Sequence, residues 1–164
     1  RDGKLVEETV PLRGVSAAVR ERLVVFGGKL ASVYQAFGYR GYLSADALLD
    51  EAGNLTFTEM NARVGGSQHL YEAIAHGVVH AREQPERTVV QYVSGRDWRL
   101  RGVGHLIEAA RAAGVAYDPA ARTGVIAAMP LAGEPGAGGL LFCVVYGEEG
   151  EQHEIVRKLA RQFC

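Results

Sequence analysis

The chain has 164 residues, of which 48% are hydrophobic and 23% charged, and its formal net charge is -1. These values are ordinary for a globular protein, and a charge so near zero creates no field that would attract nucleic acid or an anionic membrane. No apolar run is long enough to span a bilayer, so we expect neither a nucleic-acid partner nor a membrane partner.

The cysteines and the opening residues indicate the environment of the chain and its relation to a longer protein. The cysteines, Cys143 and Cys164, have no metal-type spacing, and we expect a reducing, cytoplasmic environment. The opening residues, Arg1 to Val6, contain no initiator methionine and are typical of the second strand of a β-hairpin. We therefore expect the sequence to be a fragment of a longer polypeptide.

The first predicted helix begins after Ser16, a candidate N-cap, and ends at about Phe37. Apolar residues recur in it at three- and four-residue steps, which predicts one stripe that faces a core. The stripe consists of Val19, Leu23, Phe26, Leu30, Val33 and Phe37. Gly27 and Gly28 in mid-helix cost stability relative to alanine, so either the helix bends there or another element packs close to it.

Two strand-like runs follow at residues 39–50 and 54–63, separated by the polar residues Glu51 to Asn54. A connection of this length is typical of a β-hairpin. The glycine loop from Val64 to Ser67 comes next, and Ser67 is a candidate N-cap for a second helix at residues 68–81.

Beyond Pro85 the sequence alternates strand, helix, strand, strand and helix, which predicts a small α/β lobe. These elements are expected at residues 89–93, 103–113, 125–130, 140–146 and 151–163. The connection from Ala132 to Gly139 is expected to be a solvated hairpin loop or a mobile flap. We predict an α+β protein with two domains, residues 1–84 and residues 85–164.

The hairpin carries the residues that indicate chemistry. Side chains alternate between the faces of a strand, so Ser44, Asp46 and Leu48 share one face, while Phe57, Glu59, Asn61 and Arg63 share a face of the partner strand. If Asp50 pairs with Leu55, then Leu48 pairs with Phe57, Asp46 with Glu59, and Ser44 with Asn61. All of these side chains then lie on one side of the hairpin.

Two carboxylates opposite each other are destabilising unless something neutralises them. Asp46, Glu59 and the amide oxygen of Asn61 offer hard oxygen ligands, which suit Mg²⁺, whereas the absence of His and Cys among them makes zinc a poor fit. Arg63 lies one step further along and is a candidate catalytic residue that stabilises charge on a phosphate or carboxylate. An alternative is that the two acids are merely solvated and Arg63 forms a structural ion pair with Glu59.

The glycine loop could contribute to the same chemistry. Gly65, Gly66 and Ser67 lead into a predicted helix N-terminus, where free backbone N–H groups and the helix dipole attract anions. We therefore include these three residues, with Glu59, Asn61 and Arg63, among the candidate nucleotide-binding residues. An ordinary glycine turn is the alternative interpretation.

Asp46, followed thirteen residues later by Glu59-Met60-Asn61-Ala62-Arg63 and then by Val64-Gly65-Gly66-Ser67, resembles the metal-binding hairpin of the ATP-grasp ligases. The resemblance covers about residues 15–81 and implies the carboxy-terminal lobe of that fold, an antiparallel hairpin sheet packed on helices. It implies that Asp46, Glu59 and Asn61 hold Mg²⁺ and that Arg63 contacts the reacting phosphate or carboxylate. The implied nucleotide lobe with its lysines belongs to an amino-terminal part of the same protein.

The lobe after Pro85 resembles the carboxy-terminal extension of the pheganomycin-type peptide ligases. Together the resemblances imply an ATP-dependent ligase that joins a carboxylate to an amine or peptide acceptor through an acyl phosphate. Two alternatives stay open: an ATP-grasp enzyme with another acceptor, such as a carboxylase or an amino-acid-modifying synthetase, and a non-catalytic binding module that keeps only the fold. A homodimer is also possible, because apolar faces of the later lobe suit either packing or a subunit interface.

Overall fold

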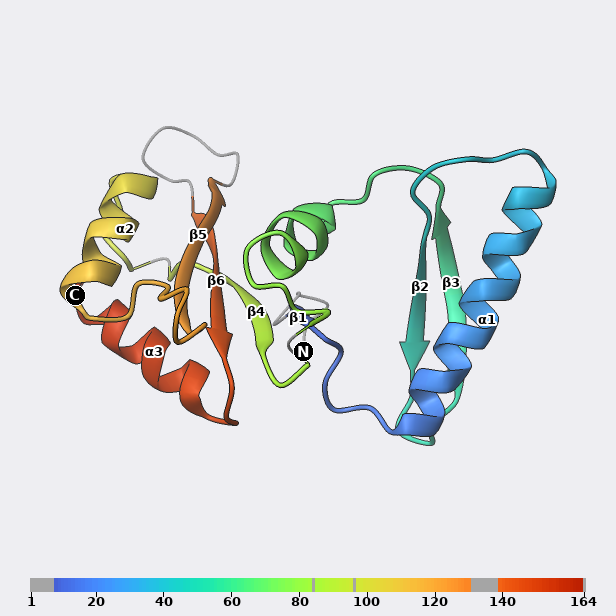
Figure 1. Cartoon of the computed structure of the whole chain (residues 1–164), viewed down its shortest axis with the longest axis horizontal. Helices are drawn as coiled ribbons and strands as arrows, with labels where there is room; N and C mark the ends of the chain where they lie inside the picture. The colour runs from blue at the N-terminus through green and yellow to red at the C-terminus, as the bar shows by residue number, and fades with distance from the viewer. Residues whose placement is uncertain (1–7, 84, 96, 131–138, 164) are drawn as a thin grey trace. The chain divides into compact units, whose positions relative to one another are not determined.

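The computed structural model describes residues 8–83, 85–95, 97–130 and 139–163. The described chain is α+β, with two antiparallel sheets (Figure 1). It divides into two compact units. The hairpin unit is Leu12–Gln68, and the sheet unit combines the residues up to Pro11 with those from His69 onward. The expected strand at residues 1–6, most of the expected loop at 132–139, and Cys164 lie outside the described residues.

The hairpin unit consists of one long helix along a two-stranded antiparallel sheet (Figure 1). Its elements are α1 (Ala17–Ala36), β2 (Ser44–Leu49) and β3 (Leu55–Asn61). The predicted start of the helix is confirmed, because the Ser16 side chain accepts a hydrogen bond of 3.2 Å from the backbone N–H of Val19. The predicted end is confirmed by the C-cap at Phe37.

The predicted apolar stripe of α1 is right only in part. Val19 is buried and Leu23 and Leu30 are half-buried, whereas Phe26, Val33 and Phe37 are exposed. The helix continues without interruption through the two glycines. A Cβ atom added at either glycine would meet nothing within 4 Å, so no described neighbour requires glycine there.

The sheet unit is built on four antiparallel strands in the order β1-β4-β6-β5 (Figure 1). The strands are β1 (Glu8–Val10), β4 (Thr88–Val93), β5 (Gly124–Pro130) and β6 (Leu140–Tyr146). The helices are α2 (Val103–Ala112), α3 (Glu151–Ala160) and the π-helix η1 (His69–His76). The helices and strands predicted after Pro85 are all present, but every ladder is antiparallel, so this lobe is α+β rather than α/β.

Both faces of this sheet are covered, because successive side chains of a strand point to opposite sides. On β6, Phe142 and Val144 join a buried cluster with α2 and α3, whereas Cys143 and Val145 join a second cluster with η1. All four side chains are fully buried. The unit is therefore a three-layer arrangement with the sheet in the middle.

The segment that begins at His69 differs from its prediction. The helix expected to reach Ala81 ends at His76, and its hydrogen bonds are of the i→i−5 type, such as Gly77 N–H to Glu72 C=O at 2.9 Å. Leu70 and Ile74 of η1 are buried against the sheet, so this segment belongs to the sheet unit, although the sequence placed it before a boundary at 84/85. No helix in the described parts of the chain combines the length and apolar character needed to cross a bilayer.

Candidate functional site

The hairpin is closed by a polar turn between β2 and β3. Asp50 accepts hydrogen bonds from the backbone N–H and the side-chain amide of Asn54, at 2.7 and 2.8 Å, and its own N–H donates to the Asn54 carbonyl at 3.1 Å. The side-chain bond from Asn54 is the largest cause that lowers the pKa of Asp50 below its ordinary value. Gly53 adopts a φ of +82°, which glycine tolerates. Arg22 of α1 donates to the Gly53 carbonyl at 3.1 Å and so fastens the turn to the helix.

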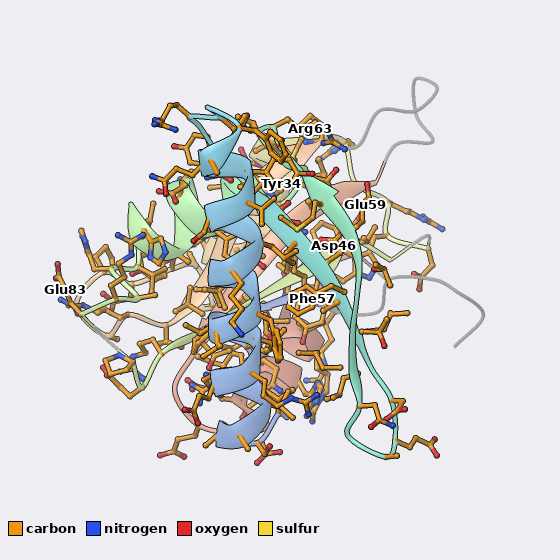
Figure 2. The ribbon with its side chains drawn as sticks, turned by 90° about the vertical axis from the view of Figure 1, so that its right-hand side faces the viewer. Tyr34, Asp46, Phe57, Glu59, Arg63 and Glu83 are labelled. Carbon is orange, nitrogen blue, oxygen red and sulfur yellow. The ribbon has the colours of Figure 1, made fainter. Side chains whose placement is uncertain are left out.

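Asp46 and Glu59 are direct partners across the hairpin, as predicted, and Ser44 is the partner of Asn61. Figure 2 shows Asp46 and Glu59 at neighbouring positions on the two strands. Both carboxylate-bearing residues are exposed. Directly opposed residues have Cβ atoms about 4.5–5.5 Å apart, so two negative charges face each other at short range.

The predicted register is wrong toward the turn. The pairing shifts by one residue between Asp46 and Ala47, so Ala47 pairs with Phe57 and Leu48 pairs with Thr56. The expected pairs Leu48–Phe57 and Asp50–Leu55 are therefore not formed. Phe57 is half-buried, with its ring centroid 6.5 Å from that of Phe26 of α1. It lies on the helix side of the hairpin and not beside Glu59.

Asn61 is the last residue of β3 and is half-buried. Arg63 lies two residues later, in a bend, and is exposed. Figure 2 shows it beyond the end of β3. Because the strand has ended, the alternation that predicted Arg63 on the face of Glu59 no longer fixes its direction.

The glycine loop starts beside the end of the hairpin that lies away from the β2–β3 turn. A Cβ atom at Gly65 would lie 3.9 Å from the Ser44 hydroxyl oxygen, so the loop passes close to the Ser44–Asn61 pair. The Gly65 carbonyl accepts the N–H of Gln68 at 3.2 Å, which closes a turn around Gly66 and Ser67. The hairpin unit ends at Gln68, and the chain returns to the sheet unit at His69.

The donor set of this site suits Mg²⁺ by its chemistry. Asp46 and Glu59 supply two carboxylates from directly paired positions. Asn61, two residues after Glu59 on the same strand, supplies an amide oxygen. Within the described residues, no group of three or more His, Cys, Asp or Glu side chains could hold a metal ion. A dedicated all-protein cage is not what Mg²⁺ requires, since it is usually bound by one or two carboxylates together with substrate phosphates and waters.

The sheet unit holds two polar networks, the first of which no sequence pattern indicated. Gln91 is buried; its amide N–H donates to the Glu8 carboxylate at 3.1 Å, and its oxygen lies 2.7 Å from Nε2 of His69. These residues are far apart in the sequence, and only the pairing of β1 with β4 brings Glu8 to Gln91. The partial burial of Glu8 and His69 makes this network an anchor between β1, β4 and η1.

The second network surrounds Glu151 at the start of α3. Burial raises the pKa of Glu151, but hydrogen bonds from the N–H groups of Gly147 and Glu148 and from the Thr123 hydroxyl, with the charge of Arg87, outweigh it. The pKa of Glu151 therefore lies below its ordinary value. The predicted start of this helix at residue 151 is confirmed.

Comparison with known families finds a match to part of the chain. The sequence model of a family described as PGM1 C-terminal domain matches residues 105–159, about a third of the chain. The matched segment runs from α2 through β5 and β6 to α3 and lies within the sheet unit. None of the curated proteins compared with the chain matches it.

Proposed function

We propose that the hairpin unit is the metal-binding part of an ATP-grasp ligase, which forms an amide or peptide bond through an acyl phosphate. The observation that carries the proposal is the pairing of Asp46 with Glu59 on the exposed face of the hairpin, next to the pair of Ser44 with Asn61. Opposed carboxylates in a two-stranded sheet oppose folding unless a cation offsets their repulsion. Their presence is therefore better explained by a bound cation than by stability.

The family match concerns the expected carboxy-terminal extension. It falls on residues 105–159, in the part of the chain that the sequence assigned to a carboxy-terminal extension, and the family description itself names a carboxy-terminal domain. The resemblance of the lobe after Pro85 to the extension of the pheganomycin-type peptide ligases is our reason to favour a peptide ligase over a carboxylase. We include in the proposal a cytoplasmic setting, which suits the free, buried Cys143.

The proposed reaction has two steps. A carboxylate oxygen of the substrate attacks the γ-phosphorus of ATP in line, the bond to ADP breaks, and an acyl phosphate forms. The nitrogen of an amine or peptide acceptor then attacks the acyl carbon. Phosphate leaves with the electrons of the carbon–oxygen bond, and the nitrogen loses a proton.

The residues of the hairpin have distinct roles in this reaction. Asp46, Glu59 and Asn61 would hold Mg²⁺, which when bound neutralises charge on the transferred phosphoryl group. Arg63 would donate hydrogen bonds to the phosphate or carboxylate oxygens, and its fixed charge stabilises the oxyanion of the second step. The backbone N–H groups of Gly65, Gly66 and Ser67 would hold a nucleotide phosphate.

The test is an ADP-formation assay on the full-length protein with Glu59→Gln, which keeps the size of the side chain and removes its charge. We expect activity to fall at least about 100-fold, because even residues that only support a metal ligand are worth 10- to 100-fold. Glu51→Gln is the matched control, since Glu51 is an exposed acid in the turn of the same hairpin. It should stay within about twofold of the parent protein.

Activity retained by Glu59→Gln would refute the metal assignment. Acceptor dependence then separates the enzyme classes: release of phosphate that requires an amine or peptide supports the peptide ligase, and release that requires bicarbonate supports a carboxylase. A full-length protein that forms no ADP with any of these acceptors would favour the non-catalytic binding module.

A further inference from the structure

The hairpin is irregular at one residue beside its two acids. The pairs Ser44–Asn61 and Asp46–Glu59 follow one register, and the pairs from Ala47–Phe57 onward follow another. Thr58 is the residue on β3 that this shift leaves without a partner of its own, which is the definition of a β-bulge.

The bulge changes which side chains share a face. In a regular strand Phe57 and Glu59 would point to the same side. Here Thr58 and Glu59 are consecutive exposed residues, while Phe57 and Met60 on either side are half-buried. The strand thus packs Phe57 toward α1 and still directs Glu59 toward Asp46.

A bulge also weakens the ladder, because the extra residue makes none of the regular strand bonds. At this position the Thr58 hydroxyl donates a hydrogen bond of 3.3 Å to the backbone carbonyl of Asp46. This bond crosses the hairpin at the residue that carries one of the two opposed carboxylates. It restores a connection between β2 and β3 where the ladder is disrupted, beside the two opposed carboxylates.

We propose that Thr58 is a positioning residue for the cation site: its hydroxyl holds the Asp46 backbone so that the carboxylates of Asp46 and Glu59 stay at the separation that one divalent cation needs. Thr58 acts through the position of Asp46 and does not itself reach the substrate. The inference rests on the proposed function, because it assumes that these two carboxylates bind the cation.

The experiment measures Mn²⁺ binding to the full-length protein in the presence of ADP, from the loss of the free-ion signal in electron paramagnetic resonance beyond the loss that the same concentration of ADP causes without protein. Thr58→Val removes the hydroxyl and keeps a β-branched side chain that suits a strand, so folding should persist. We expect its Kd for Mn²⁺ to rise about 3- to 10-fold, the effect of one lost hydrogen bond. Thr58→Ser keeps the hydroxyl and should bind within about twofold of the parent.

Thr56→Val is the matched control, since Thr56 is the neighbouring exposed threonine on β3 and pairs with Leu48. It should leave Mn²⁺ binding unchanged. In the ADP assay, Thr58→Val should raise the Mg²⁺ concentration needed for half-maximal rate and leave the rate at saturating Mg²⁺ nearly intact.

The outcomes separate the two proposals. If Asp46→Asn abolishes Mn²⁺ binding while Thr58→Val binds like the parent, the positioning role is wrong and the metal site stands. If Thr56→Val weakens binding as much as Thr58→Val does, the effect comes from the strand and not from the hydroxyl, and the positioning role is again wrong. If Asp46→Asn leaves Mn²⁺ binding unchanged, the proposed function itself fails.

Discussion

The two units of this chain differ in how much apolar surface they bury. In the sheet unit, Phe142, Leu70, Leu106 and Leu159 are fully buried, and apolar clusters cover both faces of the sheet. Throughout residues 12–68, all of which are described, Val19 is the sole buried hydrophobic side chain. The unit with the self-sufficient core carries no candidate catalytic residue, and the unit with the candidate site has little core of its own.

The strongest test of this contrast replaces one phenylalanine by alanine in each unit and compares the losses of unfolding free energy. Phe142→Ala removes a fully buried ring that stacks on Trp98, with centroids 5.6 Å apart, and should cost about 3–5 kcal/mol of unfolding free energy. Phe37→Ala removes a ring that is 88% exposed and should change stability by less than about 0.5 kcal/mol. Urea unfolding followed by circular dichroism measures both.

The sole tryptophan allows unfolding of the sheet unit to be followed separately. Trp98 lies in the sheet unit and stacks on Phe142 and Phe163, so its fluorescence reports that unit alone. Equal losses from Phe142→Ala and Phe37→Ala would show that the hairpin unit has a hidden core and would contradict the contrast between the units.

Two glycines sharpen the comparison at a smaller scale. Gly124 adopts a φ of +119°, and a Cβ there would lie 2.6 Å from the Ala116 carbonyl oxygen, so Gly124→Ala should destabilise by about 1–3 kcal/mol. Gly27 in α1 has open space around it, and Gly27→Ala should stabilise by about 0.5–1 kcal/mol through helix propensity. Thermal unfolding of the two variants gives opposite shifts in Tm. A loss of stability in Gly27→Ala would mean that another element packs against that part of α1.

The smallest effect concerns pH. The folded state lowers the pKa of Glu151 below its ordinary value of 4.5, so the contribution of Glu151 to stability is complete above pH 4.5 and is lost as the pH falls through the folded pKa. Glu151→Gln should therefore cost about 0.5–1 kcal/mol at pH 7 and progressively less on acidification. Glu149→Gln, an exposed acid in the same stretch, should cost nothing at either pH. The Trp98 signal in urea, recorded at pH 7 and pH 3, checks both, and a cost that does not change with pH would contradict the assignment.

Local signals predicted much of this structure. The bounds of β6 were predicted correctly because Leu140 to Tyr146 is a continuous apolar run, and the start of α1 because Ser16 is a strong cap. The predicted pairing of Asp46 with Glu59 is confirmed, but the predicted register at the turn is wrong by one residue and the bulge at Thr58 compensates for it.

What the sequence did not predict depends on tertiary contacts. Thr58 is a β-branched residue that suits a regular strand. The local sequence therefore does not predict the bulge that moves Phe57 to the helix side. The early end of η1 reflects its packing and hydrogen bonding, which periodicity does not encode. β1 is three residues long, and its paired residues in β4 lie 79 to 83 positions away, so no short window of sequence contains both strands.

That last pairing has a consequence for the timing of synthesis. The sheet unit includes residues on both sides of the hairpin unit in the sequence, so β1 leaves the ribosome before its partner β4 has been made. At the usual 5–20 residues per second, the residues up to β4 take roughly 4–16 seconds to follow. The hairpin unit has its whole sequence available during that delay, whereas the sheet cannot close until β4 has been translated.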